Sequence, residues 1–206
     1  FENLLRQALN DARDWPVGVN LAVNVSPHHL RNPWFAQKLL KLLVEANYPP
    51  HRLEIELSES ALSENISLIR TIMTSLQNQG VRITFDNFGT GQSSLSRLRL
   101  LPFDRLKIGR DLIASMEHSE ESAAIVRSVV SLGEGLGLPI TVEGVESPAV
   151  LAELCRLGNY RGQGMLYGAP QTAAELLDEL QAKDMVKAAE ASLGTAHAAP
   201  LAARTA

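Results

Sequence analysis

The chain has 206 residues, of which 45% are hydrophobic, and its formal net charge is −4. This length allows one domain with a substantial core, and the acidic balance without a Lys/Arg block argues against a nucleic-acid polymer as partner. No apolar run reaches the roughly 18 residues that a membrane span needs, so we expect no membrane contact. The single cysteine, Cys155, rules out an internal disulfide and favours a reducing compartment, the cytoplasm.

Helix-like and strand-like segments alternate along the chain. Residues 1–15 are expected to form an amphipathic helix, since they lack the basic start and apolar centre of a signal peptide. Strand-like segments lie at residues 18–26, 52–59, 81–87, 103–110, 138–144 and 161–168. Helix-like segments lie at residues 33–47, 65–79, 93–101, 119–136, 148–158 and 172–190. This alternation predicts βαβ units and therefore a parallel sheet.

The strand-like segments are apolar on one face and polar on the other. The polar positions are Asn24, Ser26, Glu54, Glu56, Thr84, Asp86, Arg105, Lys107, Thr141 and Glu143. A central strand of a doubly wound sheet would be apolar on both faces. The pattern instead predicts an α/β fold of the TIM-type (β/α) barrel class, with helices outside and a polar site at the carboxyl ends of the strands.

The predicted barrel is shorter than a complete one. A (β/α)8 barrel has eight strands and typically about 250 residues, whereas this chain shows six strand-like segments and opens on a helix. We therefore expect the first strands to be missing from this chain. We assign residues 1–190 to the barrel domain and expect the Ala-rich residues 191–206 to be a disordered tail.

The polar face carries an unbalanced group of charges. Glu56, Asp86 and Glu143 are acidic, and Lys107 is the base that shares their position late in a strand. Two like charges about 4 Å apart repel by about 4 kcal/mol at an effective dielectric of 20. One lysine cannot neutralise three carboxylates, so the group predicts either a bound metal or raised carboxylate pKa values.

Five motifs in order carry a resemblance to a known family. They are NVSPHHL, ELSES, FDNFGTGQSSLSRLRLLPFDRLKIGRDLI, TVEGVES and GQGMLYGAP. They closely resemble the EAL domain family of cyclic-di-GMP phosphodiesterases, which are bacterial signalling proteins, and the resemblance runs from Phe1 to about Pro170. It implies a TIM barrel, cyclic-di-GMP as ligand, two Mg²⁺ or Mn²⁺ ions and a homodimer.

The resemblance also implies how the metal ions are held. The metal ligands that it implies are Asn24, Glu56, Asp86 and, in place of a second aspartate, Asn87. Lys107 matches a lysine that contacts the attacking water, and Glu143 matches a glutamate that holds or activates that water. Hard cations prefer such oxygen ligands, and two of them about 3.5–4 Å apart assist in-line attack on a phosphodiester.

Three further positions have implied roles outside the metal site. Glu59 matches a glutamate that anchors the loop after the paired aspartates, here Phe88 to Ser93. Glu146 and Gln163 match residues at the nucleotide end of the pocket.

The chain departs from the family pattern in three ways. The Glu-Ala-Leu signature is absent, Asn87 replaces an aspartate, and Gly109 replaces the aspartate that usually follows Lys-Ile. An amide at position 87 removes a full negative charge and should weaken the second metal site. We therefore expect cyclic-di-GMP binding with impaired or absent hydrolysis. An active phosphodiesterase that yields linear pGpG is the alternative, and an interaction scaffold that binds no nucleotide is a third interpretation.

Overall fold

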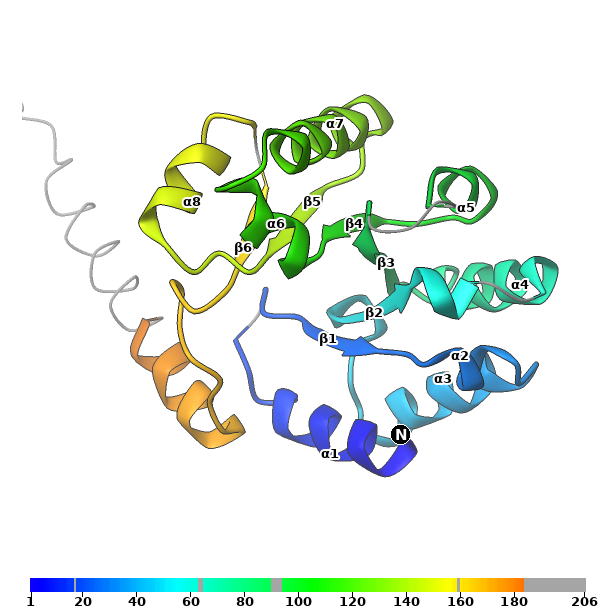
Figure 1. The fold of residues 1–206 in the computed structure, drawn as a ribbon. Coiled ribbons are helices and arrows are strands. Elements are labelled where there is room, and N and C mark those ends of the chain that lie inside the picture. Colours follow the sequence, from blue (N-terminus) through cyan, green and yellow to red (C-terminus); the bar gives the residue numbers. More distant parts are fainter. Residues whose placement is uncertain (17, 63–64, 90–93, 159, 184–206) are drawn as a thin grey trace, which may run out of the picture.

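The strands form one parallel sheet in chain order. The computed structural model describes residues 1–16, 18–62, 65–89, 94–158 and 160–183. Its sheet has six strands in the order β1-β2-β3-β4-β5-β6, and every neighbouring pair is parallel. The strands are β1 (Leu21–Asn24), β2 (Leu53–Ser58), β3 (Arg82–Phe88), β4 (Arg105–Ile108), β5 (Ile140–Glu143) and β6 (Arg161–Gln163). Figure 1 shows the sheet curving as a half-barrel, with helices along its outer side.

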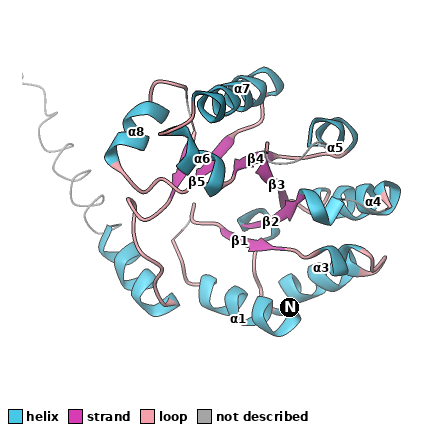
Figure 2. Ribbon diagram, viewed as in Figure 1, coloured by secondary structure: helices cyan, strands magenta, loops and turns pink. Residues whose placement is uncertain are grey.

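Helices connect successive strands and cover the convex side of the sheet (Figure 2). They are α1 (Glu2–Ala12), α2 (Pro27–Leu30), α3 (Phe35–Glu45), α4 (Ile66–Gln77), α5 (Ser94–Leu100), α6 (Arg110–Met116), α7 (Glu120–Leu136) and α8 (Pro148–Leu154). Two short 3-10 helices are η1 (Pro50–Arg52) and η2 (Glu59–Leu62), and residues 173–183 are also helical. Within the described residues, no helix has the length and apolar character required to cross a membrane.

Local sequence signals explain where the longer connecting helices begin and end. The Ser119 hydroxyl accepts a hydrogen bond from the Ser122 amide at the start of α7, and α7 ends at Gly137, whose φ of 67° closes the last turn. Ser147 caps α8 in the same way, with Pro148 at the first helical position. Asn65 accepts from the Leu68 amide at the start of α4.

The observed elements differ from the predicted ones at three places. The strand predicted at 161–168 is confined to Arg161–Gln163. No helix was predicted between the segments at 18–26 and 33–47, but His28 and His29 lie on the short helix α2, in which Pro27 takes the first helical position after Ser26. The short helix α6 was not predicted. The predicted tail, residues 191–206, lies outside the described residues, so that boundary stays a prediction.

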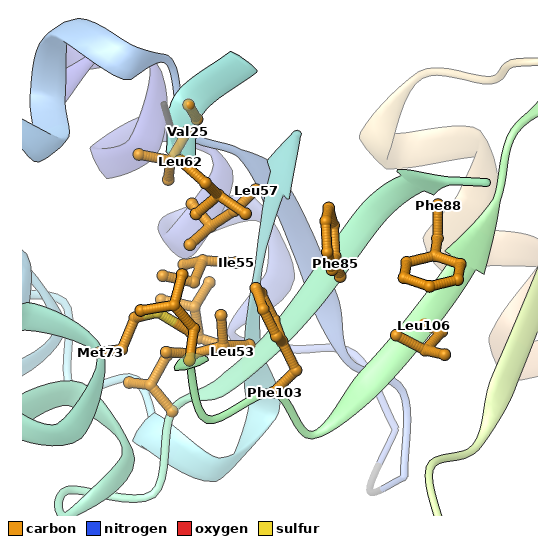
Figure 3. Packing of buried hydrophobic residues seen from close by; sticks show 14 of the residues in the cluster. Val25, Leu53, Ile55, Leu57, Leu62, Met73, Phe85, Phe88, Phe103 and Leu106 are labelled. Carbon is orange, nitrogen blue, oxygen red and sulfur yellow. The ribbon is translucent and has the colours of Figure 1, made fainter. Parts of the chain in front are cut away.

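The core lies between the sheet and the outer helices. Ile55, Leu57, Ile83 and Phe85 are fully buried on the helix-facing side of β2 and β3. The Phe85 ring stacks on Phe103 at 4.7 Å and meets Phe88 edge-on at 5.2 Å, as Figure 3 shows. Because strand side chains alternate, this packing directs the intervening polar residues of the same strands to the opposite, concave side.

Candidate functional site

A polar cavity lies at the carboxyl ends of the strands. Its volume is about 370 Å³, and it is lined by Ala22, Asn24, Glu56, Asp86, Asn87, Lys107, Arg110, Asp111, Glu143 and Gln163. Each of the six strands contributes at least one residue to this lining. The sheet register explains the convergence, because Asn24 pairs with Glu56 and Glu143 pairs with Gln163 across neighbouring strands.

Lys107 lies among three of the four carboxylates that line the cavity, those of Glu56, Asp86 and Glu143; the fourth is Asp111. Its Nζ donates to Glu56 Oε2 at 2.9 Å and lies 3.1 Å from Glu143 Oε2. The Asp86 Oδ1 atom is farther from this Nζ, at 4.0 Å. That Oδ1 is buried and has no hydrogen-bond partner among the described residues. The carboxylates that line the cavity therefore outnumber its two cationic side chains, Lys107 and Arg110, and one buried carboxylate oxygen lacks a hydrogen bond from the described residues.

The electrostatics of the three buried groups reflect this imbalance. Burial raises the pKa of Glu56, and the hydrogen bond from Lys107 offsets only part of that rise. Burial likewise raises the pKa of Asp86, against the opposing charge of Lys107. Burial acts to lower the pKa of Lys107, but the hydrogen bonds and charges of Glu56 and Glu143 outweigh it and raise the pKa overall. The raised carboxylate pKa values predicted from the sequence are thus present.

The donor chemistry of the cavity suits a hard divalent cation, although its side chains surround a lysine. Asn24, Glu56 and Asp86 present carboxylate and amide oxygens, the ligands that Mg²⁺ and Mn²⁺ prefer. Within the described parts of the chain, no three His, Cys, Asp or Glu side chains are grouped closely enough to hold one ion. A cation would therefore compete with Lys107 for these oxygens.

Asn87 is placed beside Asp86 at the rim of the cavity. Its backbone is in the left-handed region, with φ of 55°, a conformation that Asn adopts more readily than most residues. Its side-chain Nδ2 donates to Asp86 Oδ2 at 3.1 Å. In this pose the amide presents a donor, not an oxygen ligand, to the aspartate.

A second cavity continues from the first on the side of β6. Its volume is about 670 Å³, and Arg110, Glu143 and Gln163 line both cavities. Glu146, predicted at the nucleotide end, lines the second cavity only and forms an ion pair with Arg110 at 2.6 Å. Sequence reasoning missed Arg110, although its position three residues after Lys107 and directly beyond β4 was a signal that could have found it.

The predicted loop anchor lies apart from this group. Glu59 is half-buried in η2. Residues 90–93 of the loop that it was expected to anchor lie outside the described residues, so the role of Glu59 stays a prediction.

Comparison with known proteins identifies the family. The model of the EAL domain matches residues 1–170. The chain belongs to the EAL domain family. The predicted resemblance is thereby confirmed, and the curved parallel sheet with outer helices confirms the predicted TIM-type class.

Three relatives illustrate the match. The chain is 34% identical to the cyclic di-GMP phosphodiesterase RocR of Pseudomonas aeruginosa over 160 residues, which cover 78% of this chain and 41% of RocR. It matches the PaMucR phosphodiesterase–c-di-GMP complex with a TM-score of 0.81 and 36% identity, over 85% of this chain and 73% of that one. It matches the manganese/cy-diGMP complex of Klebsiella pneumoniae BlrP1 with a TM-score of 0.74 and 30% identity, over 80% and 43%. The chain spans about a quarter of the length of other curated relatives, 23% and 26% in two cases.

Proposed function

We propose that this EAL domain binds cyclic di-GMP with the help of divalent cations and hydrolyses it slowly or not at all. The observation that carries the proposal is the buried Asp86 Oδ1, which has no hydrogen-bond partner among the described residues and lies in a cavity in which three carboxylates share one lysine. Solved relatives in complex with c-di-GMP support the choice of ligand.

The cation end of the site would be built from residues of β1, β2 and β3. We assign Asn24, Glu56, Asp86 and Asn87 as the residues that would hold Mg²⁺ or Mn²⁺. A bound divalent cation supplies Lewis-acid stabilisation of phosphate charge and activates water as a nucleophile. It would also relieve the carboxylate repulsion that burial leaves in place.

Lys107 and Glu143 would act on the attacking water. Their charged atoms lie 3.1 Å apart, so a water that displaced this contact would find a donor and an acceptor together. Lys107 keeps its proton, because its pKa is raised, and it therefore orients the water while Glu143 accepts the proton.

The nucleotide would extend from the cation end into the second cavity. Cyclic di-GMP is a dianion with two nucleobases, and the two cavities offer a cation site at one end and Glu146 and Gln163 at the other. Carboxylate and amide acceptors of this kind suit the N–H groups of a guanine edge. Arg110 lines both cavities and is a cationic partner for phosphate between them.

Hydrolysis is expected to be impaired because of Asn87. Its amide carries no negative charge and directs Nδ2 toward Asp86. A second hard cation would be held less tightly there than between two carboxylates. The presence of Lys107 and Glu143 in the same cavity favours the second candidate, an active phosphodiesterase that releases linear pGpG.

The oligomeric state and location belong to the same proposal. We propose a homodimer and a cytoplasmic location, as the sequence predicted. Light scattering coupled to size-exclusion chromatography tests the first, and cell fractionation tests the second.

The deciding experiment pairs binding with turnover. Cyclic di-GMP is titrated into the protein by calorimetry with Ca²⁺, and product is then followed with Mg²⁺ or Mn²⁺, in the unaltered protein and in Asn87→Asp. Binding without product from the unaltered protein, and product from Asn87→Asp, is the expected result. Product from the unaltered protein supports the active phosphodiesterase instead. No binding in the presence of Ca²⁺ would contradict both.

A further inference from the structure

The backbone conformation of Gly109 does not require a glycine, but the space around its Cα does. Its φ of −73° and ψ of 155° are extended values that any residue adopts. A Cβ at this position, however, would lie 3.2 Å from Asn87 Cγ and 3.5 Å from Asn87 Cα, and deep inside the contact distance of Asn87 Oδ1. The Asn87 carboxamide therefore fills the space that a side chain at position 109 would need.

The pose of Asn87 depends on a local irregularity between two strands. The register of β3 against β4 shifts between Phe85 and Phe88, and the left-handed Asn87 lies inside this shift. Its carboxamide oxygen faces Gly109, and its Nδ2 donates to Asp86 Oδ2 at 3.1 Å. The amide thus lies between Gly109, directly after β4, and the carboxylate of Asp86.

We propose that Asn87 and Gly109 form a coupled positioning pair that orients the Asp86 carboxylate and so sets the affinity of the cavity for a divalent cation. This inference rests on the proposed function. The amide holds Oδ2, while Oδ1 is buried, lies 4.0 Å from Lys107 Nζ and has no hydrogen-bond partner among the described residues. The two departures from the EAL pattern at positions 87 and 109 are then one structural change and not two independent losses.

A side chain at position 109 breaks this arrangement. It displaces the amide, because the atom that it meets first, Asn87 Oδ1, is the end of a side chain and can move more easily than the backbone. Without the amide, the Asp86 carboxylate is free to move closer to Lys107, whose Nζ already lies 4.0 Å from Oδ1. An aspartate that pairs with Lys107 is a poorer ligand, since the cation must first displace the lysine.

The test is a double-mutant cycle with two measurements. Gly109→Ala, Asn87→Gly and the double variant are compared with the unaltered protein. Glycine is used at position 87 because it adopts a φ of 55° without strain. Mn²⁺ affinity is measured by electron paramagnetic resonance, and the thermal midpoint is measured after removal of divalent cations.

Gly109→Ala alone is expected to weaken Mn²⁺ binding by roughly tenfold, the lower end of the range for residues that orient a metal ligand. Its thermal midpoint should fall by roughly 5 °C, because the added methyl group overpacks the Asn87 contact. Asn87→Gly should weaken Mn²⁺ binding to a similar degree. In the Asn87→Gly background, Gly109→Ala should cause no further loss in either measurement.

Gly135→Ala is the matched control. Gly135 lies on α7, and among the described residues no atom outside its chain neighbours and its own helix backbone lies within 4 Å of a Cβ added there. This variant should leave Mn²⁺ affinity unchanged and raise the thermal midpoint slightly, because alanine favours the helix more than glycine does.

The outcomes separate this inference from the proposed function. If Gly109→Ala leaves Mn²⁺ binding unchanged, or costs as much in the Asn87→Gly background as alone, the coupled pair is overturned while the proposed function stands. If the unaltered protein binds no Mn²⁺, the proposed function and the effect on cation affinity are both overturned. The pairing of the two residues is then decided by whether their thermal shifts are additive.

Discussion

Two polar layers lie one above the other on the sheet, buried except for the partly exposed Glu143, and they differ in charge balance. The cavity layer comprises Glu56, Asp86, Lys107 and Glu143, at the carboxyl ends of the strands. The basal layer comprises Glu54, Thr84 and Arg105, each two residues earlier than its counterpart in the cavity layer. In the basal layer Thr84 donates to Glu54, and Arg105 Nη1 lies 3.6 Å from Glu54 Oε2.

The difference shows which polar layer is structural. The basal layer sets one carboxylate against one guanidinium, and none of its three residues lines the 370 Å³ cavity. The cavity layer sets three carboxylates against one ammonium. Each layer has one buried atom without a hydrogen-bond partner among the described residues, Arg105 Nε in the basal layer and Asp86 Oδ1 in the cavity layer, so the charge balance is what separates them. Strand alternation alone directs both layers to the concave side. The charge surplus, not burial, marks the layer that is suited to bind a cation.

Lys107→Met should have the largest effect, because it removes the cation of the cavity layer. Without divalent cations the three carboxylates are left uncompensated, and the free energy of unfolding should fall by about 4 kcal/mol. Added Ca²⁺ should restore much of this loss by taking the place of the lysine charge. Urea unfolding with and without Ca²⁺ measures both effects, and a loss that Ca²⁺ does not reduce would contradict a cation site.

Arg105→Met makes the corresponding change in the basal layer. The loss should be smaller, about 3 kcal/mol, because the Glu54 carboxylate keeps its hydrogen bond from Thr84. Here Ca²⁺ should restore nothing, since Glu54 does not line the cavity. The same urea series measures this variant. If Ca²⁺ restored the free energy of unfolding equally in Lys107→Met and Arg105→Met, the claim that only the cavity layer binds a cation would be contradicted.

Asn87→Asp should increase the excess negative charge beside the cavity layer. A carboxylate in place of the Nδ2 donor would face Asp86 Oδ2, 3.1 Å away in the present structure. Without cations this repulsion should lower the free energy of unfolding by about 1–2 kcal/mol. The added charge should tighten Mn²⁺ binding by roughly tenfold. Calorimetric titration with Mn²⁺ checks the gain, and weaker binding by the variant would contradict it.

The pH dependence of stability should reveal the raised pKa of Asp86. Because the folded-state pKa lies above the ordinary value of 3.8, ionised Asp86 costs stability at pH values above its folded pKa. That cost should shrink as the pH falls through the folded pKa and vanish below 3.8. Relative to Asp86→Asn, the cation-free protein should therefore gain stability as the pH is lowered. A difference that is constant from pH 8 to pH 4 would contradict this expectation.

Glu146→Gln should have the smallest effect on stability. It breaks the ion pair with Arg110, but the two side chains are 45% and 62% exposed. Solvent screening limits such a pair to less than about 1 kcal/mol. The midpoint of urea unfolding should therefore stay nearly unchanged. A loss of stability as large as that of Arg105→Met would contradict the expectation that the exposed ion pair contributes less than the buried one.

The sequence predicted the sheet and the convergence of the site because both follow from strand periodicity. Six strands were expected and found in chain order, and alternation brought Glu56, Asp86, Lys107 and Glu143 to one cavity. The helix α2 was missed because its 4 residues are too few for a helical pattern to emerge. The helix α6 was missed although α5 and α8, of the same length, were predicted; it begins at Arg110, inside the segment predicted as a strand at 103–110.

The sequence could not predict the contact between Asn87 and Gly109. Both substitutions were noticed, but each was interpreted alone, as a lost carboxylate. Their contact depends on the register shift between β3 and β4 and on the left-handed backbone of Asn87, neither of which has a periodic signal. Likewise, the ion pair between Arg110 and Glu146 joins the start of α6 to the segment between β5 and α8, and only the folded chain shows it.

The most direct test of the account is the thermal unfolding of the protein with and without Mn²⁺, beside Asp86→Asn. If the cavity layer is a cation site, Mn²⁺ should raise the midpoint of the unaltered protein, because a ligand that binds the folded state stabilises it. Asp86→Asn should lose most of this increase, since it removes the charge of the oxygen that has no hydrogen-bond partner among the described residues. An unaltered protein that gains nothing from Mn²⁺, or a variant that gains as much, would contradict the central claim.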